Sequence, residues 1–296
     1  MLKIKVGIGE KTFDTINWIF MIAVMAITLY PFLYVLFASF SDPLSIYERK
    51  GILLYPVDPT LEGYRLVFNN PNILLGFKNS VIYVLLGTAV SLLLTATGAY
   101  VLSRKGLMLG RAVMFMIVVT MFFGGGLIPF FLIVKGLGLV NTIWAIVLPG
   151  AVSTWNLIVM RTFFQSIPDS LIESAKIDGA NDVLIFVRIV LPLSLAILAV
   201  MALFYGVGQW NSWFNAVIFL RHREMYPLQL FLREILLINI SFKPEDINIT
   251  TQLDGVMLKK LIKYSVIIVT ITPIMLVYPF LQKYFVKGVM IGSLKE

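Results

Sequence analysis

The sequence predicts an all-α polytopic membrane protein with six transmembrane helices and a polar loop between the fourth and the fifth. Two features of composition indicate this class: 59% of the 296 residues are hydrophobic and only 14% are charged, whereas a soluble domain has roughly 25% charged residues. The third observation is that the apolar residues form long runs, close to the roughly 20 residues that a helix needs to cross a bilayer. Six such runs with their loops use up the chain, which leaves no room for a separate soluble catalytic domain.

The apolar runs and their interruptions define the individual elements. The first run contains Pro31 as an expected kink, and it is too long for the apolar region of a signal peptide and lacks a cleavage site. In the third run, Gly124–Gly126 and Pro129 weaken a helix and favour a bend or close packing. Two proline-punctuated or charged stretches, 41–74 and 221–257, are expected to be loops. The expected spans are about 16–40, 75–103, 108–132, 139–163, 184–219 and 258–282.

A polar segment, 168–183, separates the fourth and fifth expected spans. Ser170 and Glu173 have the S-x-x-E spacing of a capping box, so we expect a helix to begin at Ser170. Gly179 lies where that helix would end, because glycine tolerates the left-handed conformation of a helix stop. Asn181 or Asp182 can cap a second helix that continues into the apolar run. The sequence therefore predicts a helix, a glycine turn and another helix, all outside the bilayer.

This segment also carries a family resemblance. Permease subunits of bacterial ABC importers have a cytoplasmic loop of the form E-A-A-x3-G-x9-I-x-L-P. The present chain keeps every spacing, with Ser174 in place of the first alanine. The matching residues are Glu173, Ser174, Ala175, Gly179, Ile189, Leu191 and Pro192. The alternative interpretation is an amphipathic loop helix that only caps a helix bundle.

The resemblance extends over nearly the whole chain. Segments 51–88 and Ala99–Arg104 resemble the first outer loop and second span of carbohydrate importer permeases. Segments 123–129, 137–142 and 282–296 are similar to one branch, which transports oligosaccharides and polysaccharide fragments and includes lipoprotein- and alginate-type systems. The chain is thus identified as resembling the smaller, six-span permease of a type I importer for a sugar, and an oligosaccharide is the expected cargo.

The resemblance implies a set of partners. They are a second permease subunit, expected to be a different chain, two ATPase subunits, and an extracytoplasmic solute-binding lipoprotein that docks on 221–257 or, second, on 41–74. ATP and Mg would belong to the ATPase subunits, and this chain would hold no cofactor or metal. A helix and turn from Glu173 to Gly179 would engage the ATPase. The implied coupling residues are Glu173, Ser174, Ala175, Asp178, Gly179, Ile189, Leu191 and Pro192.

The motif also sets the expected orientation. Lysines and arginines divide equally between the two sides of the expected topology, so charge asymmetry does not decide it. A loop that meets an ATPase must be cytoplasmic, which places both termini in the cytoplasm of a bacterium whose cell membrane holds the protein. The net charge of +8 is typical of basic residues beside anionic lipid headgroups and does not indicate nucleic-acid binding.

No catalytic constellation is visible in the sequence. There is no phosphate-binding G-x4-G-K-[ST] motif, no cysteine, and only one histidine, His222. A membrane enzyme is therefore a weak alternative. An ion-coupled secondary transporter would need ionisable residues within the spans and inverted repeats, neither of which the sequence shows. An importer permease for an amino acid or peptide remains an alternative, because the coupling motif is shared across importers.

Two polar-aromatic clusters lie in the fourth and fifth expected spans and are candidates for the substrate path. Buried amides in a membrane tend to face a cavity or another helix, and aromatic faces beside amides suit a sugar. Tryptophan at a span end is also the ordinary interface belt, and that interpretation is favoured for Trp155. The candidate path residues are Trp155, Asn156, Gln209, Trp210, Asn211, Trp213 and Asn215.

Overall fold

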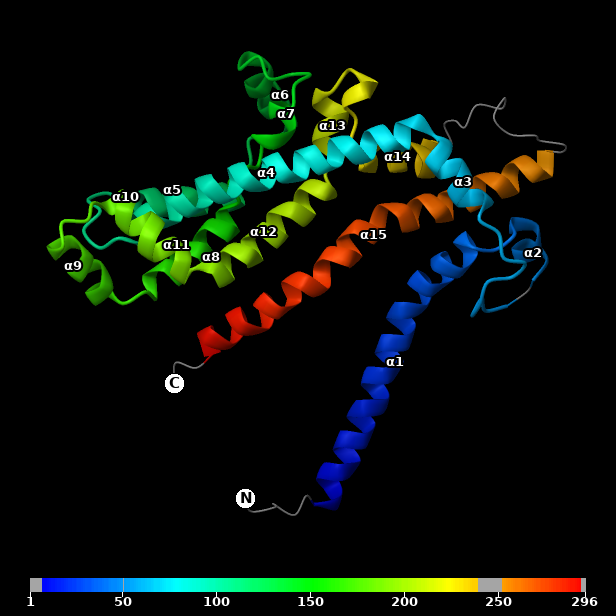
Figure 1. Ribbon diagram of the computed structural model, residues 1–296, viewed down its shortest axis with the longest axis horizontal. Coiled ribbons are helices and arrows are strands. Elements are labelled where there is room, and N and C mark those ends of the chain that lie inside the picture. Colours follow the sequence, from blue (N-terminus) through cyan, green and yellow to red (C-terminus); the bar gives the residue numbers. More distant parts are fainter. Residues whose placement is uncertain (1–6, 50, 239–251, 294–296) are drawn as a thin grey trace. The chain divides into compact units, whose positions relative to one another are not determined.

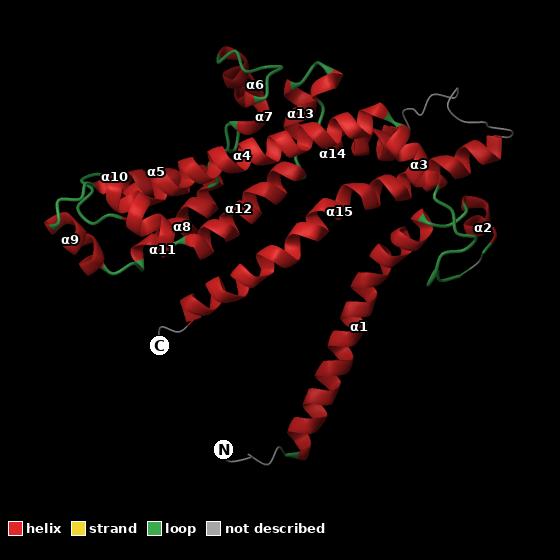
Figure 2. Cartoon of the chain, in the orientation of Figure 1, coloured by secondary structure: helices red, strands yellow, loops and turns green. Residues whose placement is uncertain are grey.

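The structure is a computed structural model that describes residues 7–49, 51–238 and 252–293. Helices and loops make up this part of the chain, and no β-strand is present in it (Figure 2). The chain divides into two compact units, Met1–Asn70 with Asn239–Ile271, and Pro71–Ile238 with Thr272–Glu296. Each unit is described by itself below, with the labels of Figure 1.

The first unit contains the N-terminal helix and the first half of the C-terminal one. Asp42 caps α2 by accepting hydrogen bonds from the backbone N–H groups of Leu44 and Ser45 at 3.0 and 3.1 Å, and Pro43 occupies its first position. The α1 helix is continuous through Pro31. The helices of this unit are α1 (Ile8–Ser39), α2 (Pro43–Glu48), α3 (Glu62–Asn69) and the part of α15 (Gln252–Ser293) that ends at Ile271.

The second unit is built around the long helix α4 (Pro71–Ser103). It packs along α12 (Leu195–Trp210) and α8 (Thr154–Gln165), which lie beside it in Figure 1. Small and polar residues on α4 are buried among its neighbours, including Ser91 and Thr95, so the helices approach closely. The remaining α-helices are α5 (Gly110–Phe122), α6 (Leu127–Gly136), α7 (Trp144–Val147), α9 (Asp169–Ile177), α10 (Asp182–Ile185), α11 (Leu191–Leu193), α13 (Phe214–Phe219) and α14 (Leu228–Arg233).

Short helices of other types complete this unit. A π-helix, Phe186–Val190, joins α10 to α11, and a second, Glu234–Ile238, follows α14. A 3-10 helix, Arg223–Met225, precedes α14. The second half of α15, from Thr272, belongs to this unit and contains Pro273 and Pro279.

Three of the expected spans are interrupted. The third is split into α5 and α6, which are bent by 120° at a break that contains the glycines, and Gly126 has φ +80°. The fourth is split around Pro149 and Gly150, where the backbone leaves the helical conformation. The fifth is bent by 83° at Ser194. The bend in the third span agrees with the expectation from its glycines and Pro129. The breaks in the fourth and fifth spans were not expected, because apolar composition indicates burial in lipid but not the continuity of a helix.

Length and hydropathy allow three helices of the described chain to cross a membrane, namely Gly9–Ser39, Pro71–Ser103 and Val256–Pro279. Five crossings result if each of the two bent pairs is one span. The segment expected as the fourth span is not among them, because α8 has only 12 residues. The count of six spans and their boundaries therefore remain predictions.

Candidate functional site

The α9 helix begins at Asp169, one residue earlier than the sequence predicted. Pro168 is its N-cap residue and makes no side-chain capping bond, and Asp169 lies in the first turn, where a negative charge interacts favourably with the helix dipole. Ser170 is already inside the helix, and its carbonyl accepts a hydrogen bond from Ser174 Oγ at 2.8 Å. The predicted capping box is therefore wrong, because proline with its fixed φ takes the entry position.

The end of α9 is the predicted glycine stop. Gly179 has φ +83°, and its N–H donates to the Lys176 carbonyl at 3.1 Å while the Ala180 N–H donates to the Ala175 carbonyl at 2.9 Å. This pair of bonds is a Schellman motif. A Cβ at Gly179 would meet no atom within 4 Å, so the requirement for glycine comes from the backbone conformation and not from lack of space.

The second half of the loop follows as predicted from Asn181. Its Oδ1 accepts from the Leu184 N–H at 2.8 Å and caps α10. Ile189 and Leu191 are half-buried and pack against a core that includes Tyr100. Pro192 is exposed in α11, which continues directly from the π-helix Phe186–Val190. The apolar motif residues therefore anchor the loop to the bundle.

The α9 helix has one buried face and one exposed face. Ile172 is buried in the same core as Phe164 of α8, and Ala175 packs against it. Glu173, Ser174, Asp178 and Gly179 are exposed, as is Ile177, which is 86% exposed. This exposed strip of two acids, small residues and an apolar side chain is available to another protein, while the buried face fixes its position on the bundle.

One charged pair ties the loop to the residues that follow α4, and a second lies within the loop. Lys105 Nζ lies 2.5 Å from Asp169 Oδ2, and Lys176 Nζ lies 3.2 Å from Asp182 Oδ1. The hydrogen bond and charge of Lys105 lower the pKa of Asp169, and the same contacts raise the pKa of Lys105. Both side chains are exposed, so the pair orients the loop more than it stabilises it.

A second feature of this unit is a cavity of about 800 Å³ at α8, α12 and the second half of α15. Three of the predicted path residues line it together: Asn156, Gln209 and Asn215. Gln209 lies against Gly87, where a Cβ would come within 2.8 Å of its Cδ, so the glycine makes room for the amide. No charged side chain lines the cavity in the described chain. We call it the neutral cavity.

The neutral cavity also contains residues that the sequence analysis did not single out. Tyr205 is buried, and its hydroxyl contacts Thr95 Oγ1 at 2.6 Å and accepts from the Ser153 N–H at 3.1 Å. Ser153, Ser212 and Tyr278 line the same space. Tyr205 precedes Gln209 by four residues, so helical spacing from that amide could have identified it. Ser212 lies inside the predicted polar cluster, while Ser153 and Tyr278 gave no such signal.

The other four predicted path residues do not line the neutral cavity. Trp210 is buried edge-on against Phe77, with ring centroids 5.7 Å apart. Trp213 stacks under the Arg233 guanidinium at 4.6 Å. Asn211 Oδ1 accepts from Gln229 Nε2 at 3.4 Å, and Trp155 is 61% exposed. The first three have partners elsewhere in the fold, and the exposure of Trp155 suits the membrane-interface role.

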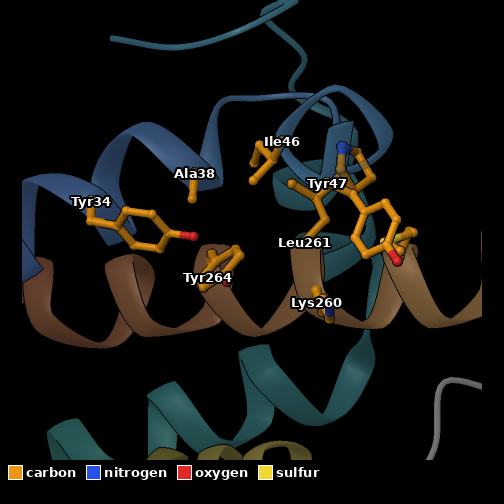
Figure 3. Close-up of a pocket in the computed structure, with 9 residues that line it drawn as sticks. Tyr34, Ala38, Ile46, Tyr47, Lys260, Leu261 and Tyr264 are labelled. Atoms are coloured by element: carbon orange, nitrogen blue, oxygen red, sulfur yellow. The ribbon is translucent and has the colours of Figure 1, made fainter. Parts of the chain in front are cut away.

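The first unit has a smaller pocket of about 210 Å³ between α1, α2 and the first half of α15 (Figure 3). Tyr34 and Tyr264 meet edge to face, with centroids 6.1 Å apart. Lys260 Nζ lies 5.8 Å from the centroid of the Tyr47 ring. These side chains contact one another across the pocket, and we assign the pocket no role. No group of acidic or histidine side chains that could hold a metal ion occurs in the described part of the chain.

Comparison with known proteins agrees with this architecture. Residues 105–291 match the family described as "Binding-protein-dependent transport system inner membrane component". YtcP of Bacillus subtilis (strain 168), a permease protein of a polygalacturonan/rhamnogalacturonan transport system, is 41% identical over 286 residues, covering 97% of this chain and 99% of that protein. LplC of the same organism is 40% identical over 288 residues, covering 96% and 95%.

A solved structure is also similar. A chain in the crystal structure of a bacterial ABC transporter that imports the acidic polysaccharide alginate has a TM-score of 0.85 and 30% identity, covering 96% of this chain and 100% of that chain. The match confirms the all-α permease fold and the resemblance found in the sequence. On this evidence the chain belongs to the binding-protein-dependent transport system inner membrane component family and is an ABC transporter permease.

Proposed function

We propose that this protein is one of two permease subunits of an ATP-driven importer, and that it carries a sugar into the cytoplasm. The observation that supports coupling most directly is the α9 loop, whose Ile172 face is buried in the bundle while Glu173 and Ile177 are exposed. A rigid loop anchored on one side transmits movement from a partner to the helices that hold it. The coupling residues remain those implied by the motif, from Glu173 to Pro192.

The partners follow from this role. A second permease, a different chain, would form the other half of the path, and two ATPase subunits would hold ATP and Mg and carry out hydrolysis. When the ATPase pair closes on ATP, each loop is carried with it and the path turns outward. Hydrolysis then resets the pair. The protein itself would supply movement and a pathway, with no cofactor of its own.

The neutral cavity supports a sugar as cargo. Its amides and hydroxyls, from Asn156, Gln209 and Tyr205 among others, can exchange hydrogen bonds with sugar hydroxyls, and its apolar walls can contact C–H faces. Two of the similar proteins named above belong to polygalacturonan/rhamnogalacturonan and alginate transport systems. We therefore propose an oligosaccharide from an acidic polysaccharide as the first cargo to test. An amino acid or peptide is the competing cargo, and an ion-coupled mechanism is the weaker alternative.

The proposal also specifies which segments of the chain lie on each side of the membrane. The α9 loop and both termini would lie in the cytoplasm of a bacterium, and segments 221–257 and 41–74 would face outward. A solute-binding lipoprotein would dock mainly on 221–257. The structure describes this segment at 221–238 and 252–257, where Arg223 pairs with Glu234 at 2.7 Å. Residues 239–251 lie outside the described residues.

The test is a census of partners. We would tag the chain in its native host, extract it in mild detergent, and identify stoichiometric companions by mass spectrometry. A second permease and an ATPase are expected, with ATP hydrolysis that falls in the Glu173→Lys protein and not in the Glu10→Lys control, whose change lies at an exposed position in the first turn of α1. Recovery of the chain without any nucleotide-binding protein would contradict the proposal and favour the ion-coupled alternative.

A further inference from the structure

A second hollow in the larger unit lies at the junction of α4, α5 and α8, and it is strongly basic. Its volume is about 630 Å³. Four cationic side chains line it, Arg104, Lys105, Arg111 and Arg161, and no acidic side chain does. We call it the basic pocket. It adjoins the α9 loop, because Lys105 pairs with Asp169.

The arginines of the basic pocket are not neutralised by a direct ion pair. None of the three forms an ion pair with a carboxylate in the described chain. Arg161 Nε donates to the Leu102 carbonyl at 2.8 Å, and Arg104 lies 4.8 Å from the centroid of the Tyr100 ring. These neutral contacts fix the two guanidinium groups without neutralising them. Arg111 is exposed and has no side-chain partner among the described residues.

The wall of the basic pocket changes from polar to apolar along α5. Arg111 lies in the first turn, and Met114, Phe115 and Val118 follow on the same face and line the same pocket. Phe115 is 70% exposed. A ligand that matches this wall has a negative head and an apolar body. An inorganic anion would match only the first turn.

We propose that the basic pocket binds an anionic phospholipid of the membrane leaflet on the α9 side. The phosphate lies among Arg104, Arg111 and Arg161, and an acyl chain follows the apolar face of α5. Basic pockets between membrane helices bind such headgroups, and each basic residue near an anionic surface contributes on the order of 1 kcal/mol. Because the pocket adjoins the loop proposed to meet the ATPase, a bound lipid would also brace the end of α4.

The experiment measures lipid binding directly. The assembled transporter, extracted with its partners and stripped of lipid, is titrated with phosphatidylglycerol or with zwitterionic phosphatidylcholine and followed by native mass spectrometry. The wild type should bind phosphatidylglycerol in preference. Arg111→Gln should weaken that binding about fivefold, Arg111→Lys should retain most of it, and Lys135→Gln, which removes an exposed charge from α6, should leave it unchanged.

Three results would overturn the proposal. The first is equal binding of the two lipids, which would also be seen if a partner subunit filled the pocket. The second is an Arg111→Gln protein that binds phosphatidylglycerol as tightly as the Lys135→Gln protein. The third is displacement of phosphatidylglycerol by excess inorganic phosphate, which would identify the ligand as a soluble anion. The readout is binding and not transport, so it does not depend on which cargo the importer carries.

Discussion

The α9 loop and the neutral cavity belong to the same unit, yet they hold their polar groups in opposite ways. The loop exposes Glu173 and Asp178 on a short capped helix, and only its apolar face is buried. The cavity collects uncharged amides and hydroxyls from separate segments, with Asn156 and Tyr205 buried. One region is a contiguous stretch of about twenty residues, and the other exists only after folding.

The difference follows from the cost of solvation. A charge on an exposed helix keeps its water, so it is available to a protein partner at little cost to folding. A charge within a membrane bundle is expensive, whereas a neutral amide is tolerated when it faces a cavity or a neighbouring helix. The contrast predicts that changes in the loop affect coupling to the ATPase, and that changes in the cavity affect cargo affinity.

The largest expected effect comes from reversing the charge of the loop. Glu173→Lys would place a lysine against the basic ATPase residue that we expect to meet Glu173, and like charges at an interface cost several kcal/mol. We expect ATP-driven uptake into proteoliposomes to fall by about a hundredfold, since each 1.4 kcal/mol is a factor of ten. Glu10→Lys, at an exposed position in the first turn of α1, is the matched control. Equal uptake by the Glu173→Lys and wild-type proteins would remove Glu173 from the interface.

A smaller loss is expected from Gly179→Leu. The left-handed conformation costs a residue with a side chain roughly 1–2 kcal/mol, so uptake should fall by about tenfold while the complex still assembles. Gly138→Leu is the control, because Gly138 also has positive φ, at +68°, and open space around its Cα. If both variants lose uptake equally, the effect is general strain and not the loop.

A substitution in the neutral cavity should change the affinity for the cargo. Gln209→Leu removes one neutral hydrogen-bonding group, worth about 1 kcal/mol, so the KM for the oligosaccharide should rise about fivefold while cargo-independent ATP hydrolysis stays unchanged. Trp155→Leu is the control, because Trp155 is exposed outside the cavity. An unchanged KM for Gln209→Leu, or a raised KM for Trp155→Leu, would place the path elsewhere.

The smallest effect concerns pH. The pKa of Asp169 is lowered by Lys105, so the pair's contribution is present above the ordinary carboxyl pKa and is lost as pH falls through the lowered value. The raised pKa of Lys105 preserves the pair on the alkaline side until pH rises through that value. Asp169→Asn should therefore lower the melting temperature slightly at pH 7 and less near pH 3. A difference that grows on acidification would contradict this pair.

The loop could be predicted from sequence because single residues determine its turns. Gly179 and Asn181 have the roles expected of them, since a left-handed residue and an N-cap are local requirements. The start of α9 was misplaced because Pro168 competes with Ser170 for the entry position. The breaks in the fourth and fifth spans were not predicted, although Pro149 and Gly150 offered a local signal in the fourth span and Pro192, two residues before the bend at Ser194, offered one in the fifth.

The cavity was predicted only in part, because its members depend on packing across helices. Asn156, Gln209 and Asn215 stood out as amides in apolar runs and do meet. Trp210 and Trp213 stood out equally, but Trp210 packs against Phe77 and Trp213 against Arg233. The sequence does not identify either contact. Tyr278 was missed because a tyrosine in an apolar run is typical of any membrane helix. Local conformation can be predicted from the sequence, whereas the sharing of a cavity cannot.

The measurement that tests the central claim most directly is a cross-link from the α9 loop to the ATPase. The chain has no cysteine, so Ile177→Cys, at an 86% exposed position of α9, introduces a single thiol. Leu137→Cys, at a 67% exposed position after α6, is the matched control. A short thiol-to-amine cross-linker should join Ile177→Cys to the nucleotide-binding subunit, with a yield that changes on adding ATP, and should leave Leu137→Cys unlinked to it. Equal yields from the two positions, or none from Ile177→Cys in an assembled complex, would contradict the account.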